Sequence, residues 1–194
     1  MAFKEKGYQV IREFLEPSFV EFIQQYFFVR INAGQAILGD IQAPNSYGFY
    51  ADPLIETILE NSCKNIGEVI GIELLPTYSF TRLYGKDDEL LKHKDRPSCE
   101  ISATISLGIP ENTNINPLFF SKTGCENDSD KVLLNPGDMC IYRGCDIWHW
   151  REKFYQNWYL QSFLHYVDSN GQYKDWIYDK RPYLAMPLDS RINN

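Results

Sequence analysis

The sequence predicts an α+β fold, mainly β, in which an N-terminal helical layer supports an antiparallel sheet or barrel. Helical periodicity is concentrated in the first third of the chain. After Pro76 the sequence changes to short segments rich in β-branched and aromatic residues, and polar turn signals separate them. A helical segment followed by many short strands is typical of an α+β architecture.

Two helices and one short strand are expected in the first third. Residues 8–14 predict the strand, and an apolar-periodic stretch over residues 16–28 predicts the first helix. The second helix is expected to begin with Asp52 as its N-cap and Pro53 in its first turn, and to run to about Val69. Both helices carry an apolar stripe that can pack on a sheet.

Several short strands are expected in the remainder. They are Tyr78–Tyr84, Glu100–Leu107, Lys131–Leu134, Met139–Tyr142 and Trp158–Val167. Asn135-Pro136-Gly137-Asp138 predicts a tight hairpin turn, and residues 111–117 and 124–130 predict polar loops. The aromatic residues after Tyr173 predict that the C-terminal stretch packs back on the body.

We expect a single domain over residues 1–194, with helical support over about 1–75, a β core over about 76–168 and a C-terminal extension over about 169–194.

Composition and charge disfavour several classes of partner. The formal net charge is −7 and no block of lysine or arginine occurs, so we expect no nucleic-acid partner. No stretch has the length and apolar character of a membrane span, and no secretory leader is recognisable, so we expect a cytoplasmic protein without a membrane partner. The five cysteines form no close metal-binding pair and are expected to be reduced thiols.

Two of the three histidines in the chain have the spacing of a metal site. In an extended segment His93 and Asp95 point to the same side while Lys94 points away, so the pair offers two ligands to one ion. His149 follows the predicted hairpin and can supply the third ligand from a distant strand. Two histidines and one carboxylate with open positions are the ligand set of non-haem Fe(II) oxygenases. His165, in a predicted strand, is an alternative distal ligand or a core histidine bonded to backbone.

This ordered set resembles the 2-oxoglutarate and iron(II)-dependent dioxygenases, most closely the prolyl 4-hydroxylase-like branch. The resemblance covers roughly residues 10–166. It includes the helical part, the strand Phe80–Tyr84 leading into His93-Lys94-Asp95, and Pro136-Gly137-Asp138 before the strand of His149. The resemblance implies a double-stranded β-helix, a jelly-roll or cupin-like barrel. It also implies that Fe(II), 2-oxoglutarate and O2 are used to hydroxylate an unactivated carbon, with release of succinate and CO2.

The resemblance also implies a cation that binds the distal carboxylate of 2-oxoglutarate, ideally an arginine. Many relatives place this cation a short distance after the distal histidine, where this sequence has Trp158-Tyr159-Leu160-Gln161. The candidates here are Arg151, then Arg82, then Arg96, with Tyr84 at the position of a co-substrate-binding tyrosine of the branch. The substrate is expected to be a protein side chain or a small molecule.

Two other interpretations remain open at this stage. A non-catalytic cupin-like module would use the same pocket to bind a metal or a small ligand without oxygen chemistry. An interaction protein would use the charged segment from Lys86 to Arg96 only as a solvated surface, and His149 between two tryptophans would be a buried core residue.

Overall fold

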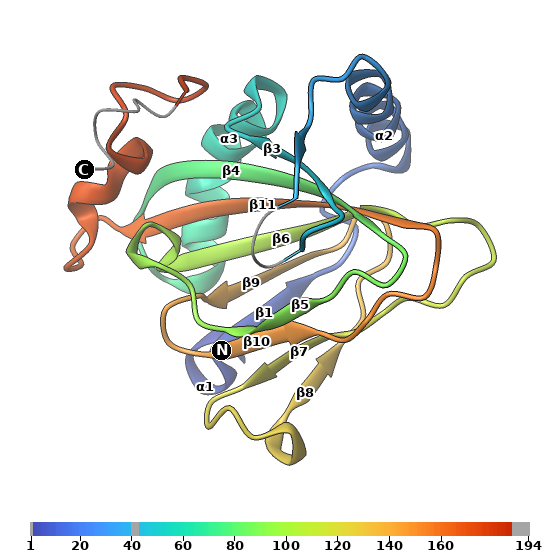
Figure 1. Ribbon diagram of the computed structural model, residues 1–194. Helices are drawn as coiled ribbons and strands as arrows, with labels where there is room; N and C mark the ends of the chain where they lie inside the picture. The colour runs from blue at the N-terminus through green and yellow to red at the C-terminus, as the bar shows by residue number, and fades with distance from the viewer. Residues whose placement is uncertain (1, 40–42, 188–194) are drawn as a thin grey trace.

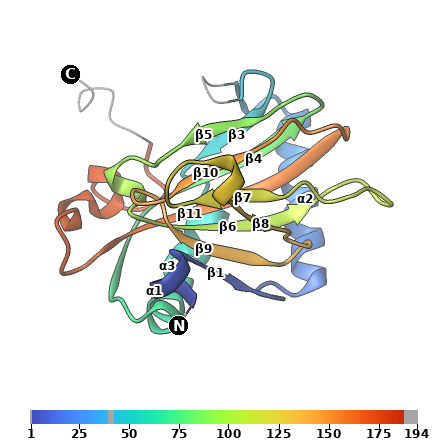
Figure 2. The ribbon, with the colours of Figure 1, turned by 90° about the horizontal axis from the view of Figure 1, so that it is seen from below.

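Two antiparallel sheets form the body of the protein in a computed structural model that describes residues 2–39 and 43–187 (Figure 1). The larger sheet has seven strands in the order β1-β9-β6-β11-β4-β3-β2, and the smaller has four in the order β5-β10-β7-β8. In Figure 2, where the molecule is seen from below, the smaller sheet lies in front of the larger one. This arrangement confirms the predicted mainly β class and the double-stranded β-helix architecture.

The elements have the following bounds. The helices are α1 (Ala2–Lys6), α2 (Pro17–Asn32) and α3 (Pro53–Ile70), with short 3-10 segments η1 (Pro97–Cys99), η2 (Glu126–Asp128) and η3 (Lys174–Lys180). The larger sheet contains β1 (Tyr8–Ile11), β2 (Ile37–Leu38), β3 (Tyr47–Tyr50), β4 (Leu74–Gly85), β6 (Ile101–Gly108), β9 (Met139–Arg143) and β11 (Trp158–Asp168). The smaller sheet contains β5 (Leu90–His93), β7 (Leu118–Ser121), β8 (Asp130–Val132) and β10 (Trp148–Arg151).

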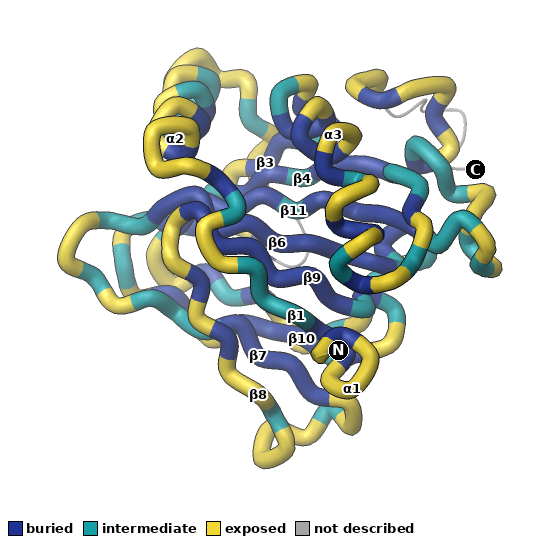
Figure 3. The backbone as a smooth tube through the Cα atoms, turned by 180° about the vertical axis from the view of Figure 1, so that it is seen from behind, coloured by how far each residue is buried: buried dark blue, intermediate teal, exposed yellow. Residues whose placement is uncertain are grey.

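Helices α2 and α3 cover the outer face of the larger sheet (Figure 3). The Asp52 carboxylate caps α3 by accepting from the N–H groups of Leu54 (2.9 Å) and Ile55 (3.3 Å), as the sequence predicted. Gly71 ends α3 in the left-handed conformation, with φ of 73°. The main hydrophobic core lies between these helices and the sheet, so the helices stabilise the sheet without entering the barrel.

Strand β11 shows how alternation separates the core from the barrel interior. Leu164 and Tyr166 belong to the core beneath the helices, whereas Phe163 and His165 line a cavity on the opposite face. Because successive side chains of a strand point to opposite faces, both sets follow from one continuous strand. The interior face of the larger sheet is therefore available for a site.

One prediction of a strand pairing is wrong. The turn at residues 135–138 does form, because Asp138 N–H donates to Asn135 O at 2.9 Å and Asp138 Oδ2 accepts from Asn135 N–H at 2.8 Å. The flanking strands β8 and β9, however, lie in different sheets and do not pair with each other. A tight turn specifies a local chain reversal, and the partners of each strand are decided by the surrounding sheets.

The composition of the sequence did not predict the bounds of the other strands. Strands β5, β7 and β10 of the smaller sheet have four residues each, which is too short to show a clear period-2 pattern. The first third of the chain also adds β2 and β3 to the larger sheet, beyond the expected β1. The described residues contain no helix with the length and hydropathy that a bilayer crossing requires.

The C-terminal stretch packs against the body, as expected, over the residues described up to Pro187; residues 188–194 of the predicted extension lie outside the described residues. Arg181 reaches Glu56 of α3 in a buried ion pair of 2.8 Å. Asp179, in the left-handed conformation with φ of 55°, accepts from both terminal nitrogens of Arg96, at 2.8 and 2.7 Å. These two ion pairs hold the segment across one end of the barrel.

Candidate metal centre and adjoining cavity

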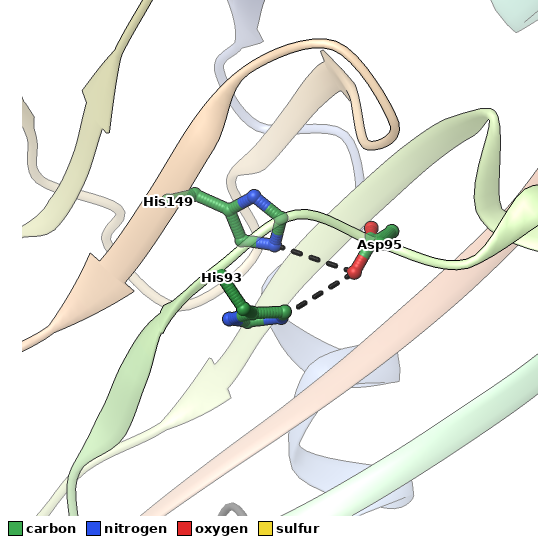
Figure 4. Close-up of side chains that lie close together, drawn as sticks. All are labelled: His93, Asp95 and His149. Carbon is green, nitrogen blue, oxygen red and sulfur yellow. Dashed lines mark ion pairs between the residues drawn. The ribbon is translucent and has the colours of Figure 1, made fainter. Parts of the chain in front are cut away.

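His93, Asp95 and His149 converge inside the barrel (Figure 4). His93 ends β5 and is the direct cross-strand neighbour of His149 in β10. Asp95 follows two residues later and turns toward both rings. One ligand atom from each residue lies within 4.8 Å of the other two. The structure therefore brings together the three residues that the sequence singled out.

Backbone carbonyls orient both imidazoles. Nδ1 of His93 lies 2.7 Å from Leu91 O, and Nδ1 of His149 lies 3.2 Å from Ile147 O. A carbonyl oxygen only accepts, so each Nδ1 carries the proton and each neutral ring has a bare Nε2. Both Nε2 atoms lie 3.4 Å from the same atom, Asp95 Oδ1.

The Asp95 carboxylate is anchored on its other side. Its backbone N–H donates to Gly144 O at 2.9 Å, and Ser102 Oγ donates to Oδ2 at 2.9 Å. A Cβ at Gly144 would lie 2.3 Å from Oδ2 and 2.2 Å from Cys99 O, so this approach requires glycine. Burial raises the pKa of Asp95, but the adjacent His149 and His93 lower it well below its ordinary range. Asp95 is therefore an ionised carboxylate.

The geometry of these atoms fits a single bound ion. Two ligand atoms about 2.1 Å from one metal and about 90–110° apart lie about 3.0–3.4 Å from each other. The two separations of 3.4 Å between Nε2 and Oδ1 agree with this range. Two imidazole nitrogens and one carboxylate oxygen on one side leave the opposite side open. The donor set therefore suits Fe(II) and related divalent metals.

A cavity of about 460 Å³ opens beside the three residues. The residues that line it come from both sheets and from the segment after β5: Tyr50, Tyr78, Phe80, Arg82, Tyr84, Leu90, His93, Lys94, Asp95, Arg96, Cys99, Tyr142, His149, Phe163 and His165. Its volume falls in the range of small-molecule sites. The lining combines aromatic rings with a few cations, next to the candidate metal centre.

Arg82 and Arg151 both contact the Tyr84 ring. Their guanidinium carbons are 5.5 and 5.1 Å from its centroid. Arg82 lines the cavity. Burial lowers the pKa of His93, but the contacts of His93 with Asp95 raise it above its ordinary value. The charge of Arg82 acts in the lowering direction. Arg82 therefore faces the cavity, whereas Arg151 is not among the residues that line it.

Arg151 packs against the rings of Tyr84 and Tyr159 and is 3% exposed. Its Nη2 donates to Gln161 Oε1 at 2.7 Å. Its Nε and Nη1 are buried without a hydrogen-bond partner among the described residues, and the Tyr84 hydroxyl is in the same state. A buried cation with unused donors is costly. Arg151 and Tyr84 therefore each offer unused polar atoms to an anion.

Arg96, the third candidate cation, lies at the cavity with its guanidinium 4.6 Å from the Tyr78 ring. Asp179 already binds it through two hydrogen bonds. Its charge is therefore matched by a carboxylate of the protein, in contrast to that of Arg151.

His165 also lies near Asp95, in a group with Cys99. Its Nδ1 is 2.9 Å from Ser102 Oγ, so a serine hydroxyl lies between it and the carboxylate. Burial raises the pKa of the Cys99 thiol above its ordinary value, which disfavours the thiolate that a metal needs. The sequence suggested backbone contact for a core His165, whereas the structure gives it a side-chain partner.

Ser102, Gly144 and Gln161 were not expected at the site, because nothing in their local sequence distinguishes them from other strand and turn residues.

No family model and no curated protein matches this sequence. Solved structures match at the level of the fold. A Pseudomonas putida prolyl-4-hydroxylase has a TM-score of 0.67 at 14% identity, over 86% of this chain and 95% of that one. HygX from Streptomyces hygroscopicus, solved with nickel, 2-oxoglutarate and hygromycin B, has a TM-score of 0.65 at 13% identity, over 87% and 85%.

A third match is a Trichoplax adhaerens prolyl hydroxylase solved with a hypoxia inducible factor peptide. Its TM-score is 0.65 at 14% identity, over 87% of this chain and 86% of that one. The chain thus has the double-stranded β-helix fold of 2-oxoglutarate and iron(II) oxygenase structures, prolyl hydroxylases among them. The resemblance expected from the sequence is confirmed at the level of the fold.

Proposed function

We propose that this protein is an Fe(II)- and 2-oxoglutarate-dependent dioxygenase that hydroxylates an unactivated carbon, with release of succinate and CO2. The convergence of His93 Nε2, His149 Nε2 and Asp95 Oδ1 carries the proposal, because this donor set leaves one side of an ion open toward the cavity. Fe(II) with 2-oxoglutarate and O2 would supply the oxidising chemistry. Similarity of fold by itself assigns no reaction.

In this proposal each residue has a defined task. His93, Asp95 and His149 hold the metal, and the backbone carbonyls behind the two imidazoles keep their Nε2 atoms directed at it. Arg151 with the Tyr84 hydroxyl binds the distal carboxylate of 2-oxoglutarate. Arg82 is the second candidate for that carboxylate, and Arg96 the third because Asp179 already occupies its donors.

We propose only the chemical class of the substrate, which is a protein side chain or a small molecule that reaches the cavity. The fold neighbours include structures with a bound peptide and with hygromycin B, so the fold accommodates both kinds of ligand. We further propose one dioxygenase domain over residues 1–194, a cytoplasmic location and no nucleic-acid partner. Cell fractionation and a nucleic-acid binding assay test the last two.

The metal and co-substrate sites can be tested without a substrate. Anaerobic titration of the Fe(II)-loaded protein with 2-oxoglutarate is expected to give a saturable visible charge-transfer band. The band should be lost in His93→Ala and in His149→Ala and kept in Asp146→Ala, because the Asp146 carboxylate is exposed and is not a ligand in this assignment. Bound iron without a band indicates a binding module. Protein that binds no iron at stoichiometric levels refutes the metal centre.

Arg151→Met is expected to weaken 2-oxoglutarate binding about 10–100-fold, because it removes charge-assisted hydrogen bonds worth about 1.5–3 kcal/mol. The apparent Kd for 2-oxoglutarate, measured from the same band, checks this. Arg82→Met is the matched variant, because Arg82 also contacts the Tyr84 ring, and it should have the smaller effect. A larger effect at Arg82 would transfer the carboxylate to that residue, and no effect at Arg151 would refute its role.

A further inference from the structure

Ser102 of β6 links Asp95 to His165 behind the candidate metal centre. Its Oγ lies 2.9 Å from Asp95 Oδ2, 2.9 Å from His165 Nδ1 and 3.2 Å from Cys99 O. Ser102 is fully buried and His165 is 6% exposed. His165 stacks on Tyr78, with ring centroids 4.5 Å apart. The three polar groups are thus held in place by packing as well as by hydrogen bonds.

The number of protons determines the direction of each hydrogen bond. A serine hydroxyl carries one hydrogen, and both Asp95 Oδ2 and Cys99 O can only accept it. That hydrogen is therefore given to one of these two oxygens, and His165 must donate its Nδ1–H to Ser102 Oγ. The Asp95 contact is the shorter of the two, and its acceptor is charged. Burial lowers the pKa of His165 to about 4, so the ring is neutral near pH 7.

This chain of donors constrains how the carboxylate can rotate. With Oδ2 engaged by Ser102, Oδ1 is the oxygen that faces Nε2 of His93 and Nε2 of His149. Rotation that presented both oxygens to an ion would break the hydrogen bond to Ser102. It would also leave the buried serine hydroxyl with only its longer contact, to Cys99 O at 3.2 Å.

We propose that Ser102 is a positioning residue that makes Asp95 a one-oxygen metal ligand, and that His165 holds Ser102 in the donating orientation. This inference rests on the proposed function in that it needs a metal at His93, Asp95 and His149. Asp95, Cys99 and His165 form a second group of potential metal ligands. In this proposal that group supports the first metal site and binds no second ion. Outer residues that orient metal ligands typically contribute 10–100-fold to metal affinity.

The first experiment measures Co(II) affinity from the visible d–d absorption of the full-length protein. Ser102→Ala is expected to bind Co(II) about 10–100-fold more weakly than the unchanged protein. Ser162→Ala is the matched control: its hydroxyl is equally buried and contacts Thr81 Oγ1 at 2.6 Å, away from Asp95. Its affinity should be unchanged. Equal affinity in Ser102→Ala, or an equal loss in Ser162→Ala, overturns the proposal.

The second experiment keeps the proposal testable if Ser102→Ala fails to fold. Long-range 1H–15N NMR of the unchanged protein at pH 8 reports the tautomer of each of its three histidines. His165 is expected to be protonated on Nδ1, and Zn(II) should shift the Nε2 signals of His93 and His149 but leave the His165 nitrogens nearly unchanged. A proton on Nε2 of His165, or direct Zn(II) coordination by His165, overturns the proposal. Absence of any Zn(II) shift at His93 and His149 would instead refute the proposed function.

Discussion

Asp95→Ala is expected to abolish succinate formation from 2-oxoglutarate in the absence of substrate. The alanine removes the one anionic ligand, whose Oδ1 lies 3.4 Å from both imidazole Nε2 atoms. Loss of an outer partner of a ligand already costs about 10–100-fold, so loss of the ligand itself should reduce turnover by at least about 100-fold. Succinate release by the Fe(II)-loaded protein under air is the measurement.

The matched control for this substitution is Asp146→Ala, which removes a carboxylate from the turn between β9 and β10. The Asp146 side chain is 64% exposed and pairs only loosely with Arg143, at 3.7 Å. Succinate formation and Co(II) binding should be unchanged in this variant. Turnover that persists in Asp95→Ala at the level of Asp146→Ala would show that the assigned site is not where the metal acts.

Glu56→Gln is expected to lower the free energy of unfolding by about 3–5 kcal/mol, because it leaves Arg181 as a buried charge without its partner. Both side chains are 1% exposed and their ion pair measures 2.8 Å. Glu56 also accepts from the backbone N–H groups of Ser79 and Ala185, so one carboxylate joins α3, β4 and the C-terminal segment. Urea unfolding monitored by circular dichroism measures the change.

A second position on α3 provides the control for burial. Glu68→Gln removes one partner of the exposed pair with Lys64, which measures 3.9 Å with side chains 65% and 86% exposed. Exposed pairs contribute about 0–1 kcal/mol, so this variant should unfold close to the unchanged protein. Similar stabilities for Glu56→Gln and Glu68→Gln would show that the buried pair does not anchor the C-terminal segment.

Local signals account for what could be predicted of the fold. The N-cap Asp52 and the proline after it specify the start of α3 through contacts within one helical turn, and they were predicted correctly. The strands β4, β6 and β11 have eight or more residues each, long enough for their composition to be recognised. The hairpin expected at residues 135–138 failed because strand partners are chosen by long-range packing, which a turn signal does not contain.

The candidate site likewise has one part that local sequence predicts and another that depends on long-range packing. The spacing of His93 and Asp95 places two ligands on one side of an extended chain, a property of local geometry that the sequence alone contains. The pairing of His149 with His93 depends on β10 meeting β5 in the smaller sheet, and no local pattern predicted that these two strands pair. The structure brings the distal histidine to the pair through this contact.

By itself, the sequence determined the mainly β class, the two supporting helices and the pair of His93 and Asp95, because each depends on periodicity, caps or short spacing. Only the tertiary structure decided that Ser102 and Gly144 support Asp95 and that Arg151 and Arg82 both contact the Tyr84 ring. These relations join segments far apart in the chain. They arise from strand register and side-chain packing, which no local pattern encodes.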